Sequence, residues 1–181
     1  MKEVEVKARI KSKQAIMDKL QALGCKFGDV LTQSDVIFVP QDVVSLPADQ
    51  GVPVLRIRDQ NGKHIFTMKI RLTNGLDKQE SETEISNPAG LREIILAMGF
   101  KEMVRFQKTR QKTRYQNWEV CVDEIEGLGY FMECEQLTKD GDSADIQAQM
   151  VEFLKTLGVV KSDLEKFGYD VILWQHQQKS S

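Results

Sequence analysis

The chain has 181 residues, of which 41% are hydrophobic and 29% are charged, and this is enough for one domain with a hydrophobic core. Its 25 basic and 27 acidic side chains give a formal net charge of -2, which argues against bulk electrostatic attraction to nucleic acid or to membranes. We therefore expect neither of these partners, and any function that depends on charge must be local.

The first third of the chain predicts a strand, a helix and a long loop. Charged and apolar residues alternate in residues 3–10, which is the period of a strand. Ser12 can cap the helix that follows, and Gly24 can end it. Residues 27–39 become strand-like towards their end, and the three prolines in residues 40–53 predict a connecting loop.

The middle of the chain predicts hairpins followed by a helix. Asn-Gly pairs at residues 61–62 and 74–75 are typical of tight hairpin turns. They separate strands that we expect at residues 54–59, 64–72 and 79–85. The next segment, residues 87–99, predicts a helix with an apolar stripe formed by Leu91, Ile94, Ile95 and Met98.

The last part of the chain returns to strands and ends in helices. Strands are predicted at residues 100–115, 117–125 and 130–136, and the EGLG sequence forms a tight turn between the last two. Helices are predicted at residues 144–158 and 163–174, and the polar residues 175–181 are expected to be a disordered tail. Residues 1–174 thus predict a single α+β domain with mainly antiparallel strands.

Many of the predicted strands carry charges on one face and apolar residues on the other. Side chains two residues apart share a face, so Glu3, Glu5 and Lys7 lie opposite Val4 and Val6. A sheet with one solvated face would also show this split, but with mixed charges. Like charges side by side repel one another, so their clustering favours a multivalent ligand. The other charged pairs are Arg56/Arg58, Lys69/Arg71, Glu82/Glu84, Lys108/Arg110, Glu119/Asp123 and Glu133/Glu135.

These pairs match the chemistry of a metal-bound polyphosphate. Carboxylate pairs bind hard divalent cations such as Mg²⁺ or Mn²⁺, and lysine and arginine bind phosphate oxygens. If the strands curve so that their charged faces point inward, they form a barrel whose lumen holds the ligand, and helices cover the apolar outside.

The ordered set of motifs resembles the CYTH superfamily, the triphosphate tunnel metalloenzymes, over nearly the whole chain. The family signature ExExK is here Glu3-Val4-Glu5-Val6-Lys7, and LRIRD, FTMK, ESETEI, FQKTR and VDEIEGLGYFMECE follow in family order. The family includes class IV adenylate cyclases, thiamine triphosphatases and inorganic triphosphatases. The resemblance implies an eight-stranded antiparallel β-barrel, a tunnel with a charged lumen and helices packed outside.

The resemblance also implies roles for individual residues and a divalent metal, Mg²⁺ or Mn²⁺. The implied catalytic residues are Glu5, Lys7 and Asp123. The implied metal ligands are Glu3, Glu5, Glu84, Glu133 and Glu135. The implied phosphate-binding residues are Lys7, Arg56, Arg58, Lys69, Lys108, Arg110 and Arg114. A metal would lower the pKa of a bound water for hydrolysis, or of a ribose 3′-hydroxyl for cyclisation.

The long loop before LRIRD and the tyrosine Tyr169 near the C-terminus look most like the class IV adenylate cyclase branch. Conversion of ATP to cyclic AMP and pyrophosphate is therefore the first expectation. Class IV cyclases commonly carry a His-Phe pair upstream of ExExK, and this chain begins two residues before Glu3. Hydrolysis of an inorganic, nucleoside or thiamine triphosphate is therefore almost as strong an expectation as cyclisation. A non-catalytic nucleotide-binding or polyphosphate-binding module and a scaffold with a solvated sheet are further alternatives.

The cellular setting follows from the cysteines and from the apolar runs. Cys25, Cys121 and Cys134 are odd in number and lack CxxC spacing, so we expect neither a disulfide framework nor a zinc site. The sequence shows no signal-peptide pattern and no apolar run near the ~18 residues of a membrane span. We expect a soluble cytoplasmic protein, and a homodimer is compatible with the family.

Overall fold

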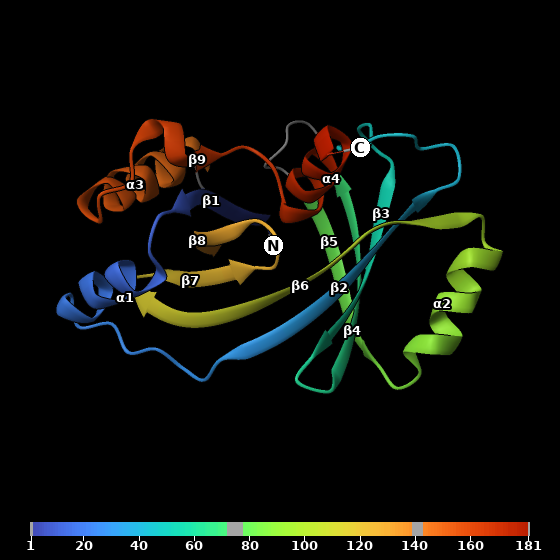
Figure 1. Cartoon of the computed structure of the whole chain (residues 1–181), viewed down its shortest axis with the longest axis horizontal. Coiled ribbons are helices and arrows are strands. Elements are labelled where there is room, and N and C mark those ends of the chain that lie inside the picture. The colour runs from blue at the N-terminus through green and yellow to red at the C-terminus, as the bar shows by residue number, and fades with distance from the viewer. Residues whose placement is uncertain (1, 72–77, 139–142, 181) are drawn as a thin grey trace. The chain divides into compact units, whose positions relative to one another are not determined.

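The computed structural model describes residues 2–71, 78–138 and 143–180 (Figure 1). Strands are the main elements of the fold. These residues form nine strands and four α-helices, so the expected α+β class is confirmed. The chain divides into two compact units, which we describe separately. The first unit contains Met1–Leu31 and Lys108–Lys166, and the second contains Thr32–Gln107 and Phe167–Ser181.

The first unit is built on an antiparallel sheet with the strand order β6-β7-β8-β1-β9. Its strands are β1 (Lys2–Ile10), β7 (Trp118–Ile125), β8 (Gly129–Thr138), β9 (Leu164–Glu165) and the second half of β6 (Phe100–Tyr115). Its helices are α1 (Lys13–Ala22), α3 (Ser143–Thr156) and the short 3-10 helix η1 (Lys161–Asp163).

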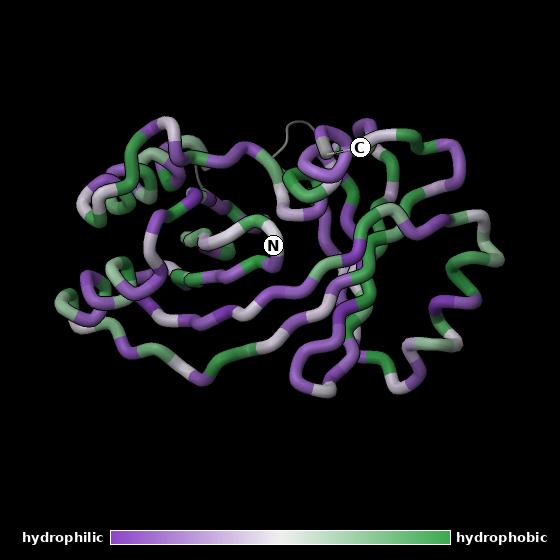
Figure 2. Tube along the Cα trace, in the orientation of Figure 1, coloured by the Kyte–Doolittle hydropathy of each residue, from purple (hydrophilic) through white to green (hydrophobic). Residues whose placement is uncertain are grey.

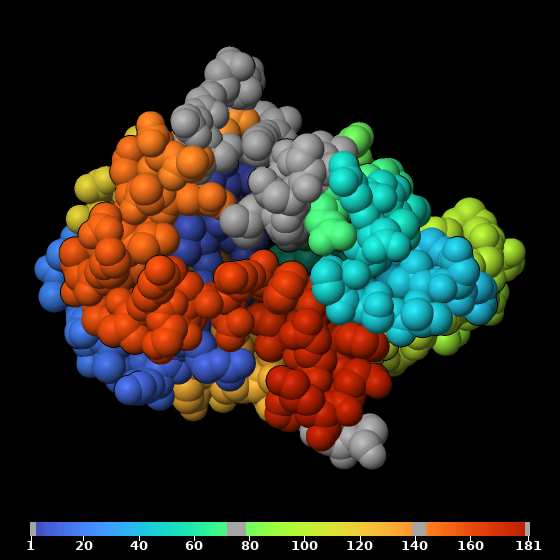
Figure 3. Space-filling model, turned by 90° about the horizontal axis from the view of Figure 1, so that it is seen from above, coloured from blue at the N-terminus to red at the C-terminus, as the bar shows by residue number. Residues whose placement is uncertain are grey.

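The core of the first unit lies between this sheet and the helices α1 and α3. Leu20 of α1 and Leu154 of α3 are fully buried against the apolar face of the sheet. That face carries Ala8, Val120, Val122, Met132 and Cys134. The alternation of hydrophilic and hydrophobic residues along these strands is visible in Figure 2, and α3 reaches the molecular surface in Figure 3. One strand face therefore supplies the core and leaves the charged face for other contacts.

The second unit carries the strand order β5-β4-β3-β2-β6. Its strands are β2 (Leu31–Pro40), β3 (Pro53–Gln60), β4 (Lys63–Arg71), β5 (Lys78–Ile85) and the first half of β6. Its helices are α2 (Pro88–Ala97) and α4 (Tyr169–Ser180). Phe38, Leu55 and Ile57 of the sheet pack with Ile95 of α2 to form a core.

Local turn and cap signals are placed as the sequence predicts. The hairpin between β3 and β4 has positive φ at Asn61 (50°) and at Gly62 (82°), which is the conformation that favours Asn-Gly. The Ser12 side chain accepts a hydrogen bond from the Ala15 amide at 3.3 Å at the start of α1. The predicted turn at residues 74–75 lies outside the described residues.

The C-terminal segment differs from the prediction of one helix over residues 163–174. Leu164 and Glu165 instead form β9, which pairs with Ala8 and Lys7 of β1, and α4 begins only at Tyr169. This ninth strand adds to the eight that we expected. Helix α4 continues to Ser180, so residues 175–180, which we expected to be disordered, are helical. None of the described helices is long and apolar enough to cross a membrane.

Helix α2 buries only one flank of the predicted apolar stripe. Ile95 is fully buried and Leu91 packs against the same core, whereas Ile94 is 56% exposed and Met98 is 60% exposed. Residues four apart lie above one another on a helix, so Leu91 and Ile95 form one flank and Ile94 and Met98 form another. The sheet contacts the first flank.

This difference gives a matched test of the second core. We expect Ile95→Ala to lower the free energy of unfolding by about 2–5 kcal/mol, because it leaves a cavity in the core. The neighbouring Ile94→Ala removes the same atoms from an exposed side chain and should change it by less than about 0.5 kcal/mol. Urea denaturation of both variants measures the difference, and equal effects would contradict this packing.

Candidate functional site

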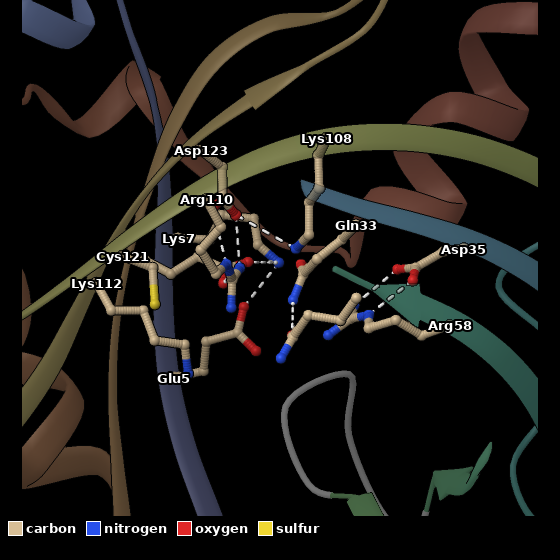
Figure 4. Close-up of polar contacts among 12 residues, drawn as sticks. Glu5, Lys7, Gln33, Asp35, Arg58, Lys108, Arg110, Lys112, Cys121 and Asp123 are labelled. Atoms are coloured by element: carbon tan, nitrogen blue, oxygen red, sulfur yellow. Dashed lines mark hydrogen bonds and ion pairs between the residues drawn. The ribbon is translucent and has the colours of Figure 1, made fainter. Parts of the chain in front are cut away.

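The charged face of the first unit carries a buried network of acidic and basic side chains (Figure 4). We call it the first charged cluster, and its members are Glu5, Lys7, Lys108, Arg110, Asp123 and Glu133. Asp123 is 0% exposed and Lys7 is 6% exposed, which is unusual for charged residues. Strand register brings the members together, because Lys7 pairs with Glu133 and Arg110 pairs with Asp123 across neighbouring strands.

Lys7 is held between two carboxylates. Its Nζ lies 2.7 Å from Oε1 of Glu5 and 2.8 Å from Oε1 of Glu133. Burial alone would lower the pKa of Lys7, but the charges of Glu133 and Glu5 outweigh burial and raise the pKa above its ordinary value. Lys7 is therefore a permanent, oriented cation.

Arg110 joins two further carboxylates. Its Nε donates to Oδ1 of Asp123 at 2.7 Å and its Nη2 donates to Oδ2 at 2.5 Å, which is a bidentate pair. Arg110 also donates to Glu133, and Nζ of Lys108 lies 3.4 Å from Oδ2 of Asp123. Burial would raise the pKa of Glu133, but Arg110, Lys7 and Lys108 together hold it well below its ordinary value. Glu133 is therefore an anion surrounded by cations.

A second acidic group lies on the same face, beside the first charged cluster. Oxygen atoms of Glu119 and Glu135 and the Sγ of Cys121 all lie within 4.8 Å of one another. Burial and the charges of Glu3 and Glu133 raise the pKa of Glu135 to about 8, although Arg110 opposes the shift. Glu119 shares a hydrogen bond with Glu135 and is also paired with Lys112. Negative charge is thus in excess here, and a proton on Glu135 neutralises part of it.

This excess of acid fits a divalent cation. Carboxylate oxygens are the ligands that Mg²⁺ and Mn²⁺ prefer, and a bound cation could replace the proton that Glu135 holds. Glu5 and Glu135 face each other in the register of β1 and β8, so their side chains project from the same face of neighbouring strands. The donor set therefore suits the metal that the sequence predicts.

The second unit has a charged cluster of its own. Arg58 donates to both carboxylate oxygens of the buried Asp35 at 2.7 Å each. Nη2 of Arg56 donates to the Thr67 hydroxyl at 3.0 Å and lies 3.4 Å from a Glu82 oxygen. Burial and the neighbouring Arg58 lower the pKa of Arg56. We call this the second charged cluster, and it also contains Lys69 and Glu80, whose charged atoms are 2.9 Å apart.

The structure places the predicted site residues in three groups. The first charged cluster brings together the catalytic candidates and most of the unit's phosphate candidates, with Glu3 and Glu135 near it. Arg56, Arg58 and Lys69 meet in the second charged cluster. Glu84 and Arg114 are exposed and belong to neither charged cluster, although Arg114 lies opposite Glu119 in the register of β6 and β7.

Three residues in or beside the two charged clusters were not predicted as site residues from the sequence. Cys121 stands between Glu119 and Asp123 at a spacing of two, so the alternation in β7 already places it on the charged face. Asp35 and Gln33 alternate with apolar residues in β2 in the same way. These alternations were present in the sequence, but a single cysteine, glutamine or aspartate in a strand does not by itself indicate a site.

The sequence of most of the chain matches one protein family. The CYTH domain matches residues 1–169 of this chain. The chain belongs to the CYTH family. A candidate adenylate cyclase from Methanocaldococcus jannaschii is 32% identical over 172 residues, which cover 93% of this chain and 97% of the relative.

Solved structures support the same CYTH fold. A protein from Pyrococcus horikoshii is 26% identical, with a TM-score of 0.81 over 96% of this chain and 99% of its own. A candidate adenylyl cyclase from Hippeastrum, described as having a dominant triphosphatase activity, is 22% identical, with a TM-score of 0.62 over 93% of this chain and 91% of its own. The antiparallel CYTH fold that the motif resemblance implied is therefore confirmed, with nine strands in the described sheet where eight were expected.

The raised pKa of Glu135 gives a test in the metal-free protein. Its pKa is about 8 in the folded state against an ordinary value of 4.5, so the folded chain binds a proton that the unfolded chain releases between these values. The stability that this proton provides is lost as pH rises towards about 8. Glu135→Gln carries no proton to lose, so its free energy of unfolding relative to wild type should increase from pH 5 to pH 8.

Chemical denaturation at several pH values measures this trend. The exposed Glu124→Gln is the control, because it removes a carboxylate from the same sheet outside the cluster. We expect its pH dependence to follow the wild type. Parallel pH profiles for wild type and Glu135→Gln would contradict the placement of Glu135 among buried acids.

Proposed function

We propose that this protein is a divalent-metal-dependent enzyme that acts on a triphosphate, with conversion of ATP to cyclic AMP and pyrophosphate as the first candidate reaction. The observation that carries the proposal is the first charged cluster, in which buried cations and carboxylates lie within contact distance. The CYTH match and the name of the Methanocaldococcus relative add support.

The acidic side chains would hold the metal. Glu3, Glu5, Glu133 and Glu135 offer carboxylate oxygens on β1 and β8, and Mg²⁺ or Mn²⁺ is the proposed cofactor. When bound, such a metal neutralises phosphate charge and makes a coordinated hydroxyl or water easier to deprotonate. The excess of acid around Glu135 supports this assignment independently of the family.

The basic side chains would bind the phosphates and stabilise the charge that develops on them. Lys7 is fixed by Glu5 and Glu133, and Arg110 is fixed by Asp123, so neither cation has to reorganise during reaction. Asp123 is proposed to act by orienting Arg110 and Lys108. Arg56, Arg58 and Lys69 of the second charged cluster, with Arg114, are further proposed phosphate ligands on the strength of the family resemblance.

The proposed cyclisation needs no covalent intermediate with the protein. The ribose 3′-hydroxyl attacks the α-phosphorus, the bond from this phosphorus to the β-phosphate oxygen breaks, and pyrophosphate leaves with its charge stabilised by the cations. The hydroxyl proton passes to a water molecule as the new P–O bond forms. Phosphoryl transfer of this kind depends mainly on positioning and on charge neutralisation, which the first charged cluster is suited to supply.

Hydrolysis of a triphosphate is the second candidate function. The same cations and the same metal would bind the substrate, and water would take the place of the 3′-hydroxyl. The triphosphatase activity described for the Hippeastrum neighbour supports keeping this candidate, since that protein shares the fold.

The products of ATP incubated with the protein and Mn²⁺ separate these reactions. We expect cyclic AMP and pyrophosphate, resolved by chromatography. ADP with phosphate, or cleavage of tripolyphosphate alone, would assign the second candidate. Stabilisation against heat by ATP and Mn²⁺ without any product would indicate a binding module instead, and an unchanged melting temperature without turnover would contradict every triphosphate role.

Substitutions in the ExExK signature test the role of the cluster. We expect Glu5→Gln and Lys7→Ala each to lower kcat by at least about 100-fold, because Glu5 is proposed to hold the metal and Lys7 to stabilise charge on the phosphates. The exposed Lys11→Ala, on the segment that follows β1, should retain wild-type turnover. Circular dichroism checks that the variants are folded. Unaltered turnover in both signature variants would overturn the assignment.

A further inference from the structure

Gln33 on β2 is a buried amide with an unused acceptor. Its side chain is 1% exposed, and its Nε2 donates to Oε1 of Gln60 at 2.5 Å. Its own Oε1 is buried and accepts no hydrogen bond from any residue that the structure describes. A buried carbonyl oxygen without a donor is costly, by about 1–3 kcal/mol, so this atom indicates a missing partner.

Gln60 fixes the direction of that oxygen. Gln33 and Gln60 are partners in the register of β2 and β3, and Gln60 accepts the hydrogen bond from the Gln33 nitrogen. The amide of Gln33 is thereby oriented with its nitrogen towards Gln60. The remaining N–H and the free Oε1 of Gln33 together offer one donor and one acceptor.

The amide lies at the end of a row of polar side chains on one sheet face. Arg56, Arg58 and Gln60 follow one another at a spacing of two on β3, and Asp35 and Gln33 do the same on β2. Figure 4 shows Gln33 beside the Asp35–Arg58 pair. Each step of two residues spans about 6.6–6.8 Å, so the row runs about 13 Å from Arg56 to Gln60. The row therefore has charged side chains at Arg56, Arg58 and Asp35 and ends in the neutral amides of Gln33 and Gln60.

A neutral amide suits a different part of a ligand from the arginines. Phosphate oxygens carry no proton to donate at neutral pH, so they cannot donate a hydrogen bond to the free oxygen of Gln33. They do suit Arg56, because its Nε is a donor that is also buried and has no hydrogen-bond partner among the described residues. An exocyclic amino group can satisfy the oxygen. Adenine presents such an amino group next to a ring nitrogen acceptor, and glutamine pairs with that edge through two hydrogen bonds.

We propose that Gln33, oriented by Gln60, is a specificity-determining residue that binds the amino edge of the adenine base, while Arg56 binds phosphate on the same strand face. This inference rests on the proposed function, because it names the substrate class as an adenine nucleoside triphosphate. It distinguishes that class from inorganic triphosphate, which has no group to pair with Gln33.

The test compares ATP with purine riboside triphosphate, which lacks only the amino group. We expect the wild-type protein to bind ATP about 10-fold more tightly in the presence of Mg²⁺, because the analogue leaves the Gln33 oxygen unpaired. Isothermal titration calorimetry measures both dissociation constants. Equal affinities, or no binding of either nucleotide, would overturn the proposal, and equal affinities would mean that only a water pairs with Gln33.

Substitutions test whether Gln33 is the residue that causes the preference for ATP over its analogue. Gln33→Met should bind the two nucleotides with equal affinity, whereas Gln107→Met, the same change at an exposed position of β6, should keep the 10-fold preference. If Gln33→Met does not fold, Gln60→Met replaces it, because loss of the orienting acceptor should also reduce the preference. A preference that survives in the folded Gln33 or Gln60 variant would contradict the assignment.

The affinity measurement can reject the role of Gln33 without rejecting the proposed function, and the reverse is also possible. Turnover of a triphosphate with equal affinities for ATP and its analogue would leave the proposed enzyme intact and remove the base-recognition role of Gln33. A 10-fold preference without turnover of any triphosphate would leave the binding of adenine intact and remove the proposed catalysis.

Discussion

The buried contact between Lys7, Glu133 and Arg110 is the constraint on which the candidate site depends. Three charges are removed from water, and Glu133 lies between the two cations, each of which also contacts a second carboxylate, Glu5 for Lys7 and Asp123 for Arg110. Loss of Glu133 would leave both cations with only part of their compensation, so this contact favours a single register of the strands β1, β6 and β8. The same contact holds the cations in one orientation, which is the condition for stabilising a transition state without reorganisation.

Strand periodicity accounts for most of what the sequence could predict. Val120 and Val122 face the helices while Asp123 faces the cluster, and alternation alone assigns these sides. The motif resemblance implied the antiparallel tunnel fold and roles for Glu5 and Lys7, which remain proposals. Alternation cannot give the partners, however, because Arg58 could have paired with several acids, and only the register of β2 and β3 selects Asp35.

The errors arise where local pattern and tertiary contact compete. Residues 163–174 contain enough apolar residues for a helix, but Leu164 and Glu165 gain backbone hydrogen bonds by pairing with β1, and Gly168 precedes a helix that starts one residue later. On α2, periodicity predicted an apolar stripe but could not tell which flank, Ile95 or Ile94, would meet the sheet. Both outcomes depend on contacts between residues far apart in sequence.

The pairing of β1 has a consequence for synthesis of the chain. Its strand partners are β8 and β9, which lie near the C-terminal end, so the ExExK signature at the N-terminus emerges from the ribosome long before either partner exists. Such distant pairing slows folding and leaves β1 as an unpaired, half-apolar strand in the nascent chain. The charges at Glu3, Glu5 and Lys7 make that exposed strand less prone to pair with other chains. Residues that are proposed for metal binding and catalysis therefore also oppose aggregation during translation.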